Sequence, residues 1–131
     1  MGGWGTGSFE NDDAQDFLGQ LKSLGIDDLK QILARVADER DYIEAPESGV
    51  AIAAAEVIAA LKGAPSQTMP REIEEWVGKT QGGSTSELKE LASRAVSKVR
   101  TNSELKDLWL EAEGLNEWSA SLRDLEQRLA D

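Results

Sequence analysis

The twelve residues Val50–Leu61, with the sequence VAIAAAEVIAAL, decide the fold of this chain. Eleven of the twelve are apolar, and Glu56 is the exception. A helix that is apolar on all sides is buried among other elements, and alanine side chains let neighbouring helices come close. A bilayer span needs about 20 apolar residues, so this segment is too short for one. It predicts a buried central helix, which we expect to run from Glu47 or the next residue to about Lys62.

Apolar residues recur with helical spacing before this segment as well. We expect one helix after the N-cap Asn11, ended by Gly25, and a second from Asp27 or the next residue to near Asp41. The stretch Tyr42–Pro46 is the expected connector, because proline disfavours a helical conformation at the residue before it.

Four more helices are expected after the central one. Their expected starts, in chain order, are Pro70, the capping box of Ser84 and Glu87, the capping box of Thr101 and Glu104, and Leu115. The last helix carries a heptad-like seam of Leu115, Trp118, Leu122, Leu125 and Leu129. No stretch alternates with period two. The whole chain, residues 1–131, is therefore predicted to be a single all-α domain of about seven helices.

The composition excludes several classes of function. The chain has no Cys and no His, which removes thiol nucleophiles, imidazole acid–base chemistry and the usual zinc sites. With 25 acidic and 14 basic residues the net charge is −11, so the chain repels nucleic acids and anionic membranes. The first ten residues hold no Lys or Arg and no apolar run, unlike a signal peptide. We expect a cytoplasmic protein without a cofactor.

Glu56 is the residue that most needs an explanation. A lone charge in the middle of an apolar helix costs several kcal/mol unless it is paired or hydrogen-bonded. We expect it to be a structural carboxylate that accepts hydrogen bonds from backbone N–H groups, a Trp indole or an Arg. Exposure at the surface and a catalytic role as a general acid or base are the alternatives.

The glycine-rich start of the chain, Gly2–Gly7, offers donors for that carboxylate. A nucleotide-binding loop would follow a strand and contain Lys, and this segment does neither. We therefore expect an ordered arm that docks on the core through Trp4 and Phe9. Backbone N–H groups of Trp4–Phe9, or the Trp4 indole, are predicted to donate to Glu56. Trp4 could alternatively contact a partner.

Acidic residues are concentrated at the start of the chain. Residues 1–46 hold ten acids and four bases, a net charge of −6 out of −11. The acids that follow Asn11 are expected to cap the helix and to compensate its dipole. They are a poor metal site, because successive carboxylates on a helix point in different directions and do not converge on one cation. If a basic partner exists, it is predicted to meet the first two helices at Asp12, Asp13, Asp38 and Asp41.

The opening Met1–Phe17, MGGWGTGSFENDDAQDF, resembles the start of a bacterial family of uncharacterised proteins, domain-of-unknown-function family 4259. Ala51–Leu61, which contains Glu56, resembles the family's Ala-Ala-Ala-Glu segment. Asn102–Leu105, with Leu108-Trp109, resembles its C-terminal motif. The resemblance implies a stand-alone bacterial cytosolic protein in which the arm and the Glu56 segment are features of one fold. It implies no site residue.

Three classes of function remain open. The first is a small acidic module that binds and neutralises a basic protein, as immunity proteins neutralise toxins; this is a class-level analogy. The second is a carboxylate-based enzyme around Glu56, with magnesium as an option; the absence of His disfavours it. The third is a homo-oligomeric structural protein that uses the seam of the last helix. For the assembly state we expect a monomer or a small homo-oligomer.

Overall fold

The structure is a computed structural model, and it describes residues 5–80 and 86–130. The helices of these ranges are α1 (Asp12–Gln20), the 3₁₀ turn η1 (Leu21–Ser23), α2 (Ile26–Ala37), α3 (Ala45–Leu61), α4 (Arg71–Lys79), α5 (Ser86–Thr101), α6 (Glu104–Glu111) and α7 (Leu115–Ala130). Within the described residues, the one extended pairing is an isolated parallel bridge between Ile43 and Ser103. The all-α prediction is confirmed.

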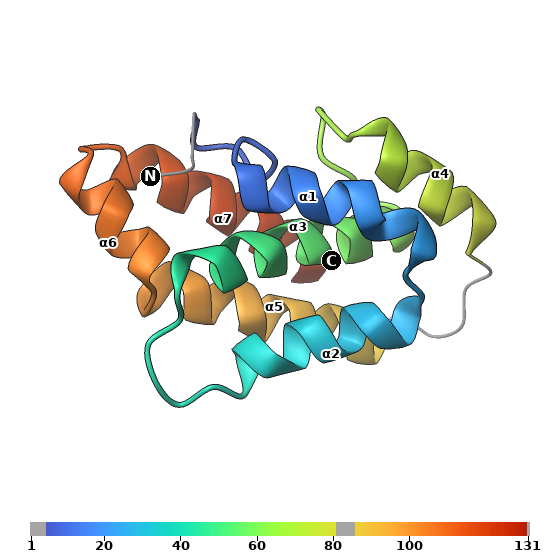
Figure 1. The fold of residues 1–131 in the computed structure, drawn as a ribbon, viewed down its shortest axis with the longest axis horizontal. Coiled ribbons are helices and arrows are strands. Elements are labelled where there is room, and N and C mark those ends of the chain that lie inside the picture. Colours follow the sequence, from blue (N-terminus) through green and yellow to red (C-terminus); the bar gives the residue numbers. More distant parts are fainter. Residues whose placement is uncertain (1–4, 81–85, 131) are drawn as a thin grey trace.

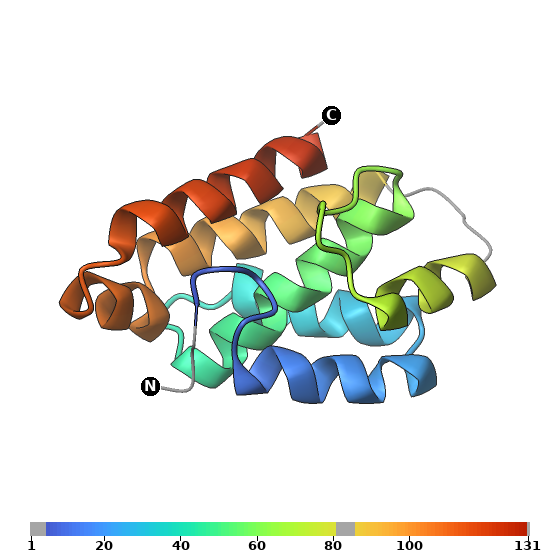
Figure 2. The same cartoon turned by 90° about the horizontal axis from the view of Figure 1, so that it is seen from above.

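Helix α3 lies at the centre of the molecule and contacts all six other α-helices. Figures 1 and 2 show it passing between α1 on one side and α7 on the other. Every residue from Ala51 to Ala60 is buried, including Glu56. This burial confirms the prediction of a buried central helix. Its small alanine side chains let neighbouring helices pack on every side. No helix in the described ranges is long and apolar enough to cross a membrane.

The seam of α7 is part of the protein's own core. Trp118, Leu122, Leu125 and Leu129 are each at most 3% exposed, and Leu115 packs at the edge of the same cluster. Helix α7 packs on α5 and α3. Since these side chains are already covered within one chain, the seam presents no free apolar stripe to a second copy.

The ends of the first three helices differ from the predicted ones. Helix α1 stops at Gln20, and Gly25 is the N-cap of α2 rather than the end of α1. Helix α2 ends at Ala37, short of the predicted Asp41. Helix α3 begins at Ala45, inside the predicted connector, because Pro46 occupies the first turn, where its missing N–H costs nothing.

Two of the later helix starts also need correction. The N-cap of α6 is Ser103, whose hydroxyl accepts from the Lys106 N–H, whereas Thr101 is still the last residue of α5. Pro70 is the N-cap of α4 rather than its first residue. The predicted cap Ser84 lies outside the described residues.

Candidate functional site

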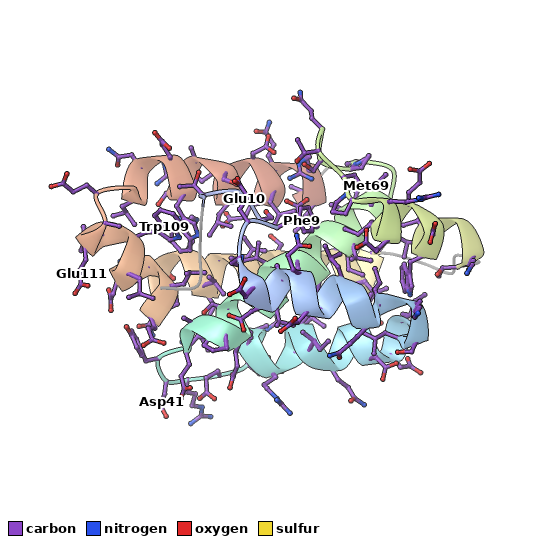
Figure 3. All side chains as sticks on the ribbon, turned by 45° about the horizontal axis from the view of Figure 1, so that its top comes forward. Phe9, Glu10, Asp41, Met69, Trp109 and Glu111 are labelled. Atoms are coloured by element: carbon purple, nitrogen blue, oxygen red, sulfur yellow. The ribbon has the colours of Figure 1, made fainter. Side chains whose placement is uncertain are left out.

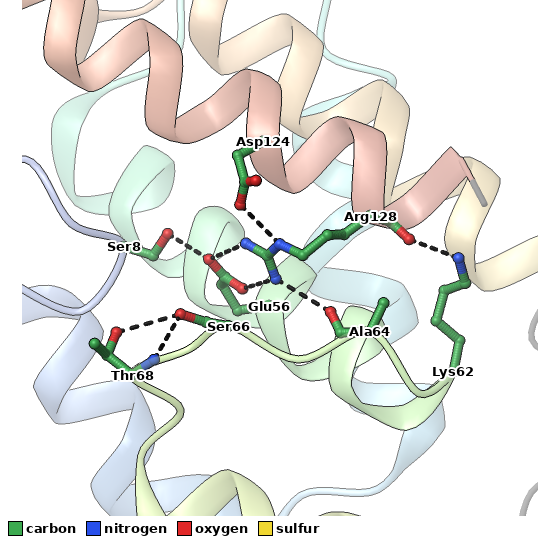
Figure 4. A network of polar contacts seen from close by, with 8 residues as sticks. All are labelled: Ser8, Glu56, Lys62, Ala64, Ser66, Thr68, Asp124 and Arg128. Atoms are coloured by element: carbon green, nitrogen blue, oxygen red, sulfur yellow. Dashed lines mark hydrogen bonds and ion pairs between the residues drawn. The ribbon is translucent and has the colours of Figure 1, made fainter.

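Glu56 forms a two-pronged ion pair with Arg128, which projects from α7. Arg128 Nη1 donates to Glu56 Oε1 at 2.8 Å and Nη2 donates to Oε2 at 3.1 Å. The hydroxyl of Ser8 in the N-terminal arm donates to the same Oε2 at 2.7 Å. Figure 4 shows the three side chains converging from the arm, α3 and α7. The carboxylate is only 4% exposed, so its charge is compensated almost entirely by these donors.

The rest of the Arg128 guanidinium is also engaged. Its Nε donates to Asp124 Oδ2 one turn earlier on α7, and Nη1 also reaches the carbonyl of Ala64. Burial alone would lower the pKa of Arg128, but the hydrogen bonds and charges of Glu56 and Asp124 raise it above its ordinary value. Lys62 Nζ donates to the Arg128 carbonyl and so reinforces the link between α3 and α7.

The sequence-based prediction for Glu56 was correct in kind and incomplete in detail. Glu56 is buried and tied to the arm, but the arm's donor is the Ser8 hydroxyl, whereas a backbone N–H or the Trp4 indole had been predicted. Trp4 itself lies outside the described residues. An Arg was among the expected donors, but the sequence did not identify Arg128 as that residue. Its only local signal is an i, i+4 spacing from Asp124, which says nothing about a helix 72 residues away.

The glycines of the arm allow a tight turn around Glu10. Gly7 N–H donates to Glu10 Oε1 at 3.0 Å, and a Cβ on Gly5 would lie 2.1 Å from Glu10 Oε2. After this turn Phe9 enters the core with 9% of its surface exposed. The predicted docking of the arm is thus confirmed for Phe9.

A polar pocket of about 580 Å³ opens beside the ion pair. Its wall contains the carboxylates of Glu10, Glu56 and Asp124 against a single cation, Arg128, so it disfavours anionic ligands. Glu56 accepts three hydrogen bonds, one at Oε1 and two at Oε2, so Arg128 and Ser8 take up most of its hydrogen-bonding capacity. The arrangement performs a structural task, fastening the arm and α7 to α3. Within the described ranges, no three Asp or Glu side chains converge as metal ligands would.

The four aspartates predicted to meet a partner fall into two pairs. Asp12 and Asp13 form the first turn of α1, where they face the positive end of its dipole. Asp38 is the C-cap of α2 and lies 3.3 Å from Arg94 of α5, while Asp41 is exposed in the connector to α3. The start of α1 and the end of α2 both lie beside the first half of α3 (Figure 1). The fold therefore brings the two pairs to the same half of the molecule, on different flanks of α3.

Most carboxylates of this region are not neutralised. Of the ten acids in residues 1–46, Asp38 is the one that pairs with a cation among the described residues. Figure 3 shows Asp41 projecting away from the fold. Nine unpaired carboxylates of like sign give this part of the surface a strong negative potential.

An open groove of about 400 Å³, here called the α2–α3 groove, has one of these acids, Asp28, in its lining. Its apolar wall consists of Leu24, Ile32, Val36 and Val50. Val36 is buried, and the other three are partly buried, so each keeps some surface accessible to water. This groove cannot be predicted from the sequence, because it depends on how α2 and α3 pack against each other.

The family model for a domain of unknown function, DUF4259, matches residues 2–121. No curated protein and no solved structure matches the chain significantly. The matched range contains the arm, the acidic first helix, the central helix α3 with Glu56, and all of α6. It ends within α7, before Arg128. The chain therefore belongs to the DUF4259 family.

Proposed function

We propose that this protein is an acidic binding module that associates with a basic protein through the surface around α1 and α2. The observation that carries the proposal is the set of nine carboxylates in residues 1–46 that form no ion pair with a side chain in the described part of the chain. Concentrated like charge attracts a partner of opposite charge over distances of about 8 Å at physiological salt and accelerates association. A protein that neutralises a basic toxin would be one form of such a module.

The position of the charge supports a specific surface over a general solubilising role. Residues 47–80 carry five acids and three bases, and residues 81–131 carry ten and seven, so opposite charges are far better balanced there. A charge that served only to keep the protein soluble would not need to be concentrated on the first third of the chain.

The test is a comparison of two variants with the same net charge. One reverses the predicted surface, with Asp12, Asp13, Asp38 and Asp41 each changed to Lys. The matched control reverses four exposed acids on α4, α5 and α7, namely Glu72, Glu74, Glu90 and Glu117. Each protein is used to capture binding partners from a cell lysate at low and at high ionic strength, and the captured proteins are quantified by mass spectrometry.

The proposal predicts that wild type and the control variant capture the same basic proteins from the lysate. The variant with the four aspartates reversed should no longer capture them. Their recovery should fall as salt increases, because the attraction is screened. With a purified partner, the association rate should fall in the same order while the dissociation rate changes little. Equal losses for both variants would instead mean that only the total charge matters, and the proposed surface would be wrong.

A further inference from the structure

We infer that the α2–α3 groove binds a basic amphipathic helix presented by the partner protein. This inference rests on the proposed function and adds the form in which the partner binds. The groove combines an apolar wall with carboxylates at its edge.

The groove has the length of a short helical contact. Along α2, its lining residues extend from Asp28 to Val36. At 1.5 Å per residue this is about 12 Å, or roughly two helical turns. A groove between two helices offers no strand edge for an extended peptide, but it does fit apolar side chains spaced i, i+3, i+4 and i+7 on a third helix.

The charges at the edge of the groove select a basic helix. Asp28 and Glu47 belong to the lining, and Arg35 is its one cation. Both carboxylates are exposed, and Asp28 accepts a hydrogen bond only from the Gly25 N–H. Lys or Arg residues that flank an apolar stripe would meet these acids, as complementary charges do at interfaces.

A second copy of this chain is a poor occupant of the groove. Each copy carries a net charge of −11, so two copies repel each other. The heptad-like seam that could have supplied an apolar helix, on α7, is buried in the chain's own core. A protein of opposite, positive charge is therefore favoured over a second copy as the occupant of the groove.

The experiment uses the full chain and two synthetic Leu/Lys peptides of equal length and composition. In one peptide the leucines form a stripe at helical spacing, and in the other the same residues are scrambled. Binding is measured by titration calorimetry, and the contacted residues are located by backbone amide chemical shifts. The striped peptide is expected to bind at least about tenfold more tightly, and to shift amides of α2 and of the first half of α3.

Two groove variants are compared with two controls. Ile32→Lys places a cation in the apolar wall, and its control, Leu110→Lys, makes the same kind of change at the 57% exposed Leu110 of α6. Glu47→Lys alters only the exposed edge, so it tests the groove even if Ile32→Lys fails to fold, and Glu74→Lys on α4 is its control. The groove variants should weaken binding of the striped peptide about tenfold, and the controls should leave it unchanged.

Equal binding of the two peptides, or equal effects of groove and control variants, would overturn the groove as the docking site. The proposed function would survive that outcome if binding still fell with salt and with reversal of the four aspartates. If neither salt nor that reversal affected binding, the proposed function would fail too. A homodimer with shifted groove amides in light scattering and NMR would identify a second copy as the occupant, and would also overturn the inference.

Discussion

Arg128 and Glu56, which are 72 residues apart in the sequence, form a bidentate ion pair between α7 and α3. The Arg128 side chain is 18% exposed and the Glu56 side chain 4% exposed, so each charge depends on the other for most of its compensation. Removing one partner leaves the other as a poorly solvated, uncompensated charge, and this strongly destabilises the folded state.

Glu56→Ala and Arg128→Ala are each expected to reduce the free energy of unfolding by about 3 kcal/mol. The double variant should lose clearly less than the sum of the two, because no charge is then left unpaired. Glu56→Gln keeps the volume and one acceptor oxygen, so it should cost less than Glu56→Ala. Urea denaturation of the wild-type protein and the four variants measures these differences. Additive losses would show that the two residues do not act as a pair.

The arm contributes a smaller share of the Glu56 site. Ser8→Ala removes one hydrogen bond to Oε2 and should cost about 1 kcal/mol. In a Glu56→Ala background the same change should cost almost nothing, because its acceptor is gone. Ser121→Ala is the matched control, since Ser121 lines the same pocket and its hydroxyl bonds to no described residue. A Ser8 effect that persists without Glu56 would place the arm's contribution elsewhere.

Two glycines of similar appearance in the sequence should respond oppositely to alanine. A Cβ on Gly114 would lie 2.6 Å from Trp109 Cε3, so Gly114→Ala must displace the indole and should destabilise by about 1–3 kcal/mol. A Cβ on Gly19 in α1 would meet nothing within 4 Å, and Gly19→Ala should stabilise by about 0.5 kcal/mol through helix propensity. Thermal melting checks both signs, and tryptophan fluorescence should change only for Gly114→Ala.

Tyr42 should ionise at unusually high pH. Its hydroxyl donates to Asp107 Oδ2, and this hydrogen bond, together with the charges of Asp107, Glu104 and Glu111, raises the pKa of Tyr42 to about 12. The neutral phenol is favoured in the folded state, so the contribution to stability is complete below pH 10 and is lost as the pH rises through about 12. The chain has one tyrosine, so tyrosinate absorbance reports this group directly.

The control for that titration is Asp107→Asn, which removes the nearest charge and should bring the pKa of Tyr42 back toward its ordinary value. Glu87→Gln on α5 changes a carboxylate that is not among the groups acting on Tyr42 and should leave the titration unchanged. An unshifted wild-type titration would contradict the hydrogen bond between Tyr42 and Asp107.

Features that depend on neighbours in the sequence were predictable. The apolar segment Val50–Leu61 is long enough and uniform enough to predict a buried helix. Asn11 is a favoured N-cap residue, and the acidic Asp12 and Asp13 follow it in the first turn of the helix. Where two neighbouring residues can each cap the same helix, the predicted helix start was less accurate. Thr101 and Ser103 can each cap α6, and the parallel bridge of Ile43 with Ser103 places Ser103 at the cap, which the sequence alone does not reveal.

By itself, the sequence determined the all-α class, the central helix, the requirement that Glu56 be compensated, and the concentration of charge in residues 1–46. Only the tertiary structure decided that Arg128 supplies that compensation and that α2 and α3 stand apart enough to leave a groove. The physical reason is range. Helix formation and charge density are set within a few residues, whereas the partner of a buried charge depends on how helices far apart in the sequence pack together.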